Sequence, residues 1–265
     1  MQLLSPAKIN LSLKVGPVDT SGYHSVDTII HLLQFGDIVT FEPAETLSVT
    51  TSVNLGIDQK ENLAYRAATH MGEVFGQNPA FHIHIEKHIP HGAGLGGGSS
   101  NAATVIAKLA QRWHVMPNDE RCLAIARSLG SDVCAFLAPT PCSRMGGYGD
   151  RLEESLPAHT GRPVALVMVP NAHASTAEVY RTFDSVGASE PTTLLINDLA
   201  KAAIEVCPQT GDALRWLEDQ PQVEQAQVSG SGAACFALLA SAEEAQALAE
   251  AAQESGLWAV ATALG

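Results

Sequence analysis

Pro90-His-Gly-Ala-Gly-Leu-Gly-Gly-Gly-Ser-Ser100 is the stretch of this 265-residue chain that says most about its fold. Alternating apolar residues at 81–85 predict a strand before it, and apolar positions over 102–113 predict a helix after it. Five of the seven residues 92–98 are glycine, so backbone N–H groups can approach a ligand without a Cβ in the way. The following helix points its positive end at the same place. The stretch therefore predicts a cradle for an anion such as phosphate.

Two standard nucleotide motifs compete for this cradle. The Walker A pattern requires a lysine where Gly98 stands, so it is excluded. Gly92, Gly94 and Gly97 satisfy the dinucleotide pattern G-x-G-x-x-G, but that pattern also needs an acid about twenty residues on, after a second strand. The nearest acids, at 119 and 120, stand at a predicted helix start instead. A flexible glycine linker is disfavoured because the stretch runs directly from a strand into a helix.

Composition narrows the class of protein. Lys and Arg number 15 against 28 Asp and Glu, a net charge of −13, which argues against binding nucleic acid or an anionic membrane. Hydrophobic residues make up 46% of the chain, enough for a full core. The five cysteines form no C-x-x-C pair, which favours free thiols in a reducing compartment. With no signal-like N-terminus and no long apolar run, we expect a cytoplasmic protein that acts on a small molecule.

The order of predicted elements indicates an α+β fold in two lobes. The first ninety residues are mostly extended, except for a helix over 62–75 that Asn62 caps. Asn118 is expected to cap a second helix that ends near Gly130. A polar, turn-forming seam at 156–161 divides the chain into an N-terminal domain, residues 1–157, and a C-terminal domain, residues 158–265.

The second domain is expected to alternate helices and strands. Ser175 with Glu178 and Ser241 with Glu244 have the spacing of capping boxes that open helices. Residues 193–206 and 241–255 read as helices, and 226–239 reads as strand, turn, strand. The turn, Ser-Gly-Ser-Gly at 229–232, suits either a hairpin or a second phosphate-facing loop.

Other polar positions are ambiguous when each is taken alone. Lys8 and Asn10 share one face of a strand if the segment is extended, but Lys8 can also be an ordinary solvated lysine on an edge strand. Asp132, just after Gly130, can be an ordinary N-cap. The turn at 22–24 offers Tyr23 and His24 for stacking, though such residues also occur in plain turns. Four histidines, at 82, 84, 88 and 91, lack an acid at ligand spacing, so no metal site is predicted.

Three segments in order resemble the three motifs of the GHMP kinase family: Pro6-Ala-Lys-Ile-Asn10, the glycine-rich stretch with Asn101-Ala-Ala, and Val228-Ser-Gly-Ser-Gly-Ala233. The resemblance implies a ribosomal-protein-S5-like N-terminal domain and a ferredoxin-like C-terminal domain. It also implies ATP as the phosphoryl donor, with Mg²⁺ arriving on the nucleotide. Residues 102–111 contain no acid for that ion, and the segment 144–150 departs from the family pattern and receives no role.

The same resemblance implies roles for individual residues. Lys8 and Asp132 form the catalytic pair, in which a carboxylate orients the acceptor hydroxyl and an ammonium stabilises charge on the transferring phosphoryl group. The implied ATP-binding residues are Pro90, His91, Gly92, Ala93, Gly94, Leu95, Gly96, Gly97, Gly98, Ser99 and Ser100 at the phosphates, with Asn62 and Lys87 near the adenine.

Gly22-Tyr-His24 and Gly130-Ser-Asp-Val133 are similar to family members that phosphorylate a cytidine-diphosphate-linked alcohol on the way to isoprenoid precursors. This likeness implies that Asn10 and His24 read the cytosine edge and that Tyr23 and Tyr180 sandwich the ring. The implied residues at the substrate diphosphate are Gly230 and Gly232.

The protein is expected to be a monomer or weak homodimer. Two alternative functions stay open. One is a kinase of a small alcohol such as homoserine or mevalonate, for which a base-stacking pair would be pointless. The other is a nucleotide sensor without catalysis, which would need neither Lys8 nor Asp132.

Overall fold

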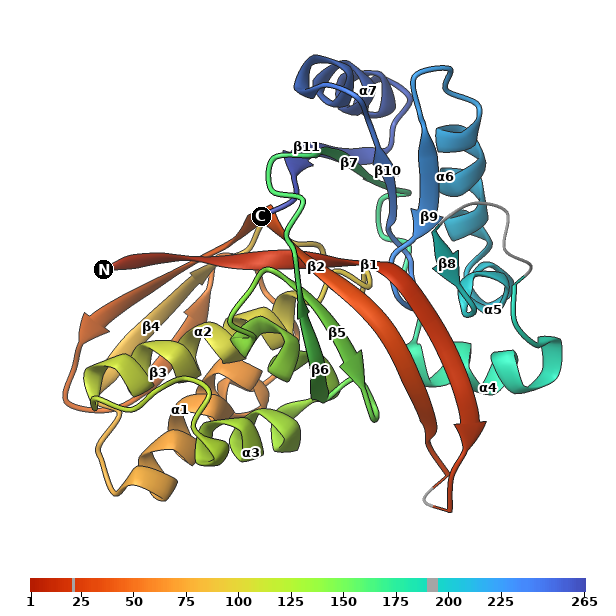
Figure 1. Ribbon diagram of the computed structural model, residues 1–265. Helices are drawn as coiled ribbons and strands as arrows, with labels where there is room; N and C mark the ends of the chain where they lie inside the picture. Colours follow the sequence, from red (N-terminus) through yellow and green to blue (C-terminus); the bar gives the residue numbers. More distant parts are fainter. Residues whose placement is uncertain (21, 190–194) are drawn as a thin grey trace.

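The computed structural model describes residues 1–20, 22–189 and 195–265, which form two β-sheets with helices packed on them (Figure 1). In these residues the larger sheet has seven strands in the order β3-β4-β2-β1-β8, with β5 pairing to β2 and β6 to β5. Its strands are β1 (Gln2–Val18), β2 (His24–Pro43), β3 (Ser48–Thr51), β4 (Phe81–Glu86), β5 (Cys142–Gly146), β6 (Arg151–Leu156) and β8 (Ile196–Asn197).

The β1–β2 hairpin is the longest feature of this sheet. Its antiparallel register runs from Gln2 opposite Thr40 to Val18 opposite His24, with irregularities that bend it along the way. Apolar side chains such as Ile9 and Ile30 are buried, while the end of the hairpin leaves the sheet and reaches towards α4 (Thr176–Val186) (Figure 1). The hairpin therefore carries residues of the first sheet to the second half of the chain.

Three helices cover one face of the larger sheet: α1 (Leu63–Phe75), α2 (Gly97–Arg112) and α3 (Glu120–Leu129) (Figure 1). Asn62 caps α1 by accepting from the Ala64 N–H, and Gly76 ends it in the left-handed conformation at φ 62°. The apolar faces of α1 and α2 pack with Ile83 and Ile85 of β4 in one core. This core holds the glycine-rich stretch between a rigid strand and a rigid helix.

The smaller sheet has the order β11-β7-β10-β9. Its strands are β7 (Pro163–Met168), β9 (Gln225–Val228), β10 (Cys235–Leu238) and β11 (Trp258–Ala263), and its helices with α4 are α5 (Ala200–Val206), α6 (Pro208–Glu218) and α7 (Ala242–Glu254). Its short central strands are almost fully buried because α6 and α7 cover them. None of the helices in the described ranges combines the length and the hydropathy needed to cross a bilayer.

The two halves of the chain are joined at several places. β8, from the second half of the chain, pairs in parallel with Ser12 and Leu13 of β1. Near the C-terminus, Leu264 bridges to Leu33, and the Gly265 N–H donates to the Leu32 carbonyl at 2.9 Å. The α+β class predicted from the sequence is confirmed. Segments from the second half of the chain pair with strands of the larger sheet.

Most local predictions are confirmed, including the hairpin over 226–239 and the capping box of Ser241 and Glu244. Three are wrong. Asp119 caps α3 instead of Asn118, because its carboxylate accepts from both the backbone and the guanidinium of Arg121. The Ser175 hydroxyl makes no capping bond to α4. The helix predicted over 193–206 begins only at Ala200, because 196–197 pair with β1; residues 193 and 194 lie outside the described residues.

Candidate active site

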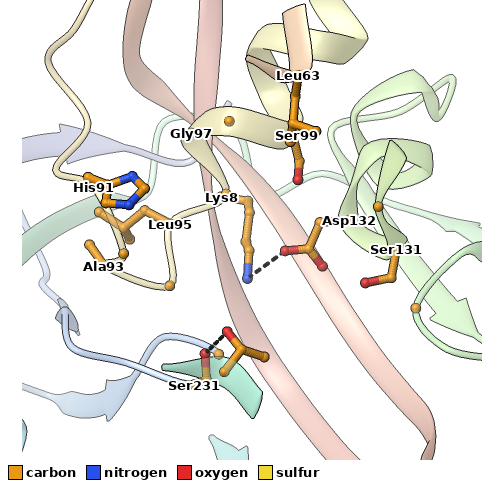
Figure 2. A pocket seen from close by; sticks show the side chains of 18 of the residues that line it. Lys8, Leu63, His91, Ala93, Leu95, Gly97, Ser99, Ser131, Asp132 and Ser231 are labelled. Carbon is orange, nitrogen blue, oxygen red and sulfur yellow. Dashed lines mark hydrogen bonds and ion pairs between the residues drawn. The ribbon is translucent and has the colours of Figure 1, made fainter. Parts of the chain in front are cut away.

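A cleft of about 450 Å³ lies between the glycine-rich stretch, the β1–β2 hairpin and the edge of the smaller sheet (Figure 2). It draws on segments far apart in the sequence, which explains why no single motif describes it. The residues selected from the sequence that line the cleft are Lys8, Asn10, Asn62, Lys87, the residues 90–99, Asp132, Tyr180 and Gly230.

The glycine-rich stretch turns through three left-handed glycines, Gly92, Gly94 and Gly96, at φ 66°, 74° and 72°. Helix α2 begins directly after them at Gly97, two residues earlier than the serines at which we expected it. Gly96 is the N-cap and has no side chain to satisfy the first N–H groups of the helix. Because Gly97, Gly98 and Ser99 line the cleft, the positive end of α2 faces it.

The two serines at this helix start have different surroundings. Ser99 lines the cleft, and Figure 2 shows its hydroxyl directed towards Asp132. Ser100 is fully buried behind the loop, where its Oγ lies 2.8 Å from the Oγ of Ser5. The structure thus presents one serine hydroxyl to a ligand and uses the other to fasten α2 to β1.

Asp37 anchors the chain where it enters the glycine-rich stretch. Its carboxylate is fully buried, and Oδ1 accepts from the backbone N–H groups of His88 and Ile89 at 2.8 and 2.9 Å. Its Oδ2 accepts from Nδ2 of Asn101 at 2.9 Å and from the ammonium of Lys87. One buried carboxylate therefore fixes both the entry to the loop and the start of α2, and Lys87 lines the cleft already paired.

Lys8 and Asp132 meet at the centre of the cleft, with 3.7 Å between Nζ and Oδ2 (Figure 2). Lys8 is 3% exposed, and its ammonium also donates to Oδ1 of Asn10 at 2.6 Å, which confirms that the two share one strand face. Asp132 lies in the first turn of a 3-10 helix, Ser131–Leu137, whose N-cap is Gly130, so the alternative of an N-cap aspartate is wrong. Its carboxylate is 37% exposed and can meet a ligand.

The Ser-Gly-Ser-Gly turn is a hairpin that also borders the cleft. It connects β9 to β10 as a hairpin, and Gly230 and Ser231 also line the cleft. It packs tightly on the glycine-rich stretch, because a Cβ on Gly94 would lie 2.2 Å from the Ser229 carbonyl oxygen. Gly232 lies behind the cleft wall, next to Thr210.

The aromatic residues of the predicted base site form two pairs. The His24 ring stacks on Tyr180 with centroids 5.6 Å apart, and its Nε2 lies 2.9 Å from the carboxylate of Asp184. The exposed Tyr23 ring packs instead against Tyr148, with centroids 5.9 Å apart. Tyr23 and His24 stand beside the cleft and not among its lining residues.

Tyr180, which stacks on His24, is also close enough to Asp132 for that carboxylate to affect its pKa. Burial raises its pKa to about 12, and the negative charge of Asp132 adds to the rise. The Tyr180 phenol therefore remains neutral and able to donate at any physiological pH.

Comparison with known proteins identifies the family. The model of the GHMP kinase N-terminal domain matches residues 62–139, and that of the C-terminal domain matches 185–256. A protein of Paramagnetospirillum magneticum named 4-diphosphocytidyl-2-C-methyl-D-erythritol kinase is 37% identical, covering 94% of this chain and 92% of its own. One of that name from Chlorobium chlorochromatii is 33% identical over 94% and 92%. This chain belongs to the 4-diphosphocytidyl-2-C-methyl-D-erythritol kinases of the GHMP kinase family.

Solved structures agree with this assignment. A crystal structure of 4-(cytidine 5'-diphospho)-2C-methyl-D-erythritol kinase superimposes with a TM-score of 0.82 at 32% identity, covering 100% of this chain and 99% of the other. A homoserine kinase from Cytophaga hutchinsonii superimposes with a TM-score of 0.71 at 15% identity, covering 100% and 94%. The second likeness shows a shared fold.

Several residues that line the cleft of this GHMP kinase were missed by sequence analysis. Thr28 accepts a hydrogen bond from Nδ2 of Asn10 across the β1–β2 hairpin, a strand pairing that the sequence analysis did not predict. Tyr148 lies in the segment 144–150, which departs from the family pattern and therefore gave no signal. The missed lining residues are Leu13, Val26, Thr28, Leu55, Ile57, Glu61, Leu63, Asn101, Gly130, Ser131, Tyr148, Gly149, Thr176, Leu199 and Ser231.

The histidines of this GHMP kinase do not gather into a metal centre. His82 and His84 lie on β4 and bond to the hydroxyls of Ser48 and Thr50 on β3. Across the described parts of the chain, no group of three or more His, Cys, Asp or Glu residues could hold an ion.

Proposed function

We propose that this protein transfers the γ-phosphoryl group of ATP to the 2-hydroxyl of 4-diphosphocytidyl-2-C-methyl-D-erythritol, giving the 2-phosphate and ADP. The reaction belongs to the non-mevalonate route to isoprenoid precursors. The observation that carries the proposal is the contact of Lys8 with Asp132 at 3.7 Å, beside a loop built to hold phosphates. The relatives that share this name over nearly the whole chain supply the identity of the substrate.

In this proposal Asp132 receives the acceptor alcohol. Its exposed carboxylate oxygen accepts the hydrogen bond of the 2-hydroxyl and orients the oxygen towards the γ-phosphorus. As the new O–P bond forms and the bond to ADP breaks, the hydroxyl proton passes to Asp132. The Lys8 ammonium, held by Asn10, stabilises negative charge on the transferring group.

The nucleotide is assigned to the glycine-rich loop. The N–H groups at the start of α2 and the hydroxyl of Ser99 receive the phosphates of ATP, with the other residues 90–100 shaping the loop. Asn62 and Lys87 border the end of the cleft proposed for adenine, where Leu55, Ile57 and Leu63 supply apolar surface.

The cytidyl group is assigned to the side of the cleft formed by β1, β2 and α4. Tyr180 and Tyr23 stack on the cytosine ring, while Asn10 and His24 read its edge. Stacking on such rings is worth about 1–3 kcal/mol per base, and edge hydrogen bonds separate cytosine from uracil. Gly230, in the turn beside Lys8, leaves backbone room for the diphosphate of the substrate, and Gly232, which faces Thr210 behind the cleft wall, shapes that turn.

Mg²⁺ is proposed to arrive with the nucleotide and to neutralise charge on its phosphates. The oxygen donors of the cleft fit such an ion, because Mg²⁺ takes one or two protein oxygens besides phosphates and water. Ser99 would hold it. We also propose that the protein acts in the cytoplasm, as a monomer or weak homodimer, apart from nucleic acids and membranes, as its charge of −13 supports.

A coupled assay of ADP release with Mg-ATP tests the function. The cytidyl substrate, homoserine and mevalonate are compared at equal concentrations. Release with the cytidyl substrate alone is expected. Release with another alcohol would retain the Lys8–Asp132 mechanism and remove the cytosine assignments. ATP binding without release for any alcohol would contradict the kinase proposal and favour a sensor.

A further inference from the structure

Tyr148 lies at the mouth of the cleft, in the turn between β5 and β6. The turn passes through two left-handed glycines, Gly147 and Gly149 at φ 67° and 94°, and the Tyr148 N–H donates to Oδ1 of Asp150 at 3.0 Å. Tyr148 and Gly149 line the cleft. An aromatic side chain that lines the cleft and is 44% exposed is thus held by a turn with a defined backbone.

This side chain is bound to the end of the β1–β2 hairpin. Its ring packs on the ring of Tyr23, and its hydroxyl donates to the carboxylate of Asp19. The other oxygen of that carboxylate lies 3.4 Å from the Tyr23 N–H, and the Asp19 N–H donates to the Tyr23 carbonyl at 2.9 Å. One carboxylate therefore links the hydroxyl of Tyr148 to the backbone of Tyr23.

Two further contacts join the same segments. The Val26 N–H donates to the Gly147 carbonyl at 2.8 Å. The Arg144 guanidinium binds both carboxylate oxygens of Asp27 at 2.8 and 2.7 Å and lowers the pKa of that carboxyl. The turn and the hairpin end are thus held together along several residues, and Tyr148 is the one whose aromatic side chain lines the cleft.

We propose that Tyr148 is a substrate-positioning residue for the pyrimidine nucleoside diphosphate part of the acceptor. It sets the position of Tyr23 through the Asp19 carboxylate, and its ring adds a second aromatic surface to the cleft that Tyr180 also lines. The proposal rests on the function proposed above and adds to it a residue in a segment that carried no role.

Steady-state kinetics with separate KM values for the cytidyl substrate and ATP tests this role. Tyr148→Ala removes the ring and is expected to raise the KM for the cytidyl substrate about tenfold, with the KM for ATP within about twofold. Tyr148→Phe and Asp19→Ala each remove the hydrogen bond and should each raise it about threefold. The double variant should have the same KM for the cytidyl substrate as either single variant, because both substitutions break the same hydrogen bond between Tyr148 and Asp19. Arg144→Gln is the matched control and should leave both KM values unchanged.

A Tyr148→Ala variant that changes both KM values equally, or neither, would overturn the proposal. If that variant does not fold, Tyr148→Phe and Asp19→Ala decide, and additive effects would overturn the linkage. Calorimetric binding of CDP separates the two proposals. If the wild-type protein releases no ADP with the cytidyl substrate, the proposed function fails; weaker CDP binding by Tyr148→Ala would still support the positioning role, and equal or absent CDP binding would reject it.

Discussion

At the scale of single residues, the chemistry of the cleft depends on a charged side chain, Lys8, that is held in one position. Lys8 is buried and bonded to Asn10 and Asp132, so its ammonium has a fixed position. Strand alternation was enough to predict that Lys8 and Asn10 share a face. Their meeting with Asp132 could be expected only by resemblance, because it depends on long-range packing. Which of Ser99 and Ser100 faces the cleft depends on the helix start, and the sequence placed that start two residues late.

Replacement of Asp132 by asparagine is expected to lower kcat by about 10²–10⁴-fold, since the amide keeps the shape but cannot accept the hydroxyl proton. The dissociation constant for ATP should stay within about threefold, because the phosphates bind to the loop. Single-turnover ADP formation and equilibrium ATP binding measure the two quantities. Lys8→Met, which retains the apolar stem, should also lower kcat; near-normal kcat in either variant would remove that residue from the mechanism.

At the scale of elements, the glycine-rich loop combines a predictable part with an unpredictable one. The strand before it, the helix after it and the reason for its glycines follow from local sequence. The buried carboxylate of Asp37 behind it and the turn at 229–232 pressed against it do not, because both come from distant segments. Gly94 belongs to both parts, since it needs a left-handed backbone and has the Ser229 carbonyl directly beside its Cα.

Gly94→Ala is expected to lower the free energy of unfolding by about 2 kcal/mol or more, because the new methyl group meets backbone and the backbone angle is strained. Gly98→Ala is the matched control: Gly98 lies in α2, and a Cβ there meets only the Leu63 side chain at 3.5 Å. That variant should be as stable as the wild type or more so. Urea unfolding followed by circular dichroism measures both, and equal stabilities would contradict the packing argument.

At the scale of the whole molecule, the two halves of the chain interlock, because β8 of the second half pairs in the larger sheet and Leu264 near the C-terminus bridges to Leu33. We propose 1–157 and 158–265 as the domain limits, with β8 of the second domain pairing to the first sheet. The sequence predicted the seam at 156–161 from its turn-forming residues. It could not predict that residues 196–197 leave a helical pattern to pair with β1, since that choice depends on the exposed edge of another sheet.

His31, which bonds to the seam between the two proposed domains, makes the stability of this junction depend on pH. It is fully buried on β2, its Nδ1 bonds to the Leu32 carbonyl at 2.8 Å, and its Nε2 accepts from the His159 N–H in the seam. Burial lowers its pKa below the ordinary 6.5, so the folded protein keeps it neutral. The unfolded chain takes up a proton there as pH falls through 6.5, and the stability due to neutral His31 is lost below that pH.

Wild-type protein is therefore expected to lose more stability between pH 7.5 and 5.5 than a His31→Gln variant does. Urea midpoints at both pH values measure the loss. His88→Gln, at a position whose side chain is 42% exposed, is the control and should follow the wild type. If His31→Gln follows the wild type as well, protonation at the junction does not govern its stability in acid.

Because the cleft lysines are paired with carboxylates, they add little positive charge to attract an anionic ligand, and this affects the rate at which such a ligand binds. In the described part of the chain, the cleft has two lysines and no arginine, and each lysine already has a carboxylate partner. The protein carries a net charge of −13, so nucleotides approach against a repulsive long-range field and are retained by short-range backbone donors. Added salt screens that repulsion over a Debye length of about 10 Å at 0.1 M, so the encounter rate rises with ionic strength, opposite to proteins that attract phosphates with a basic surface.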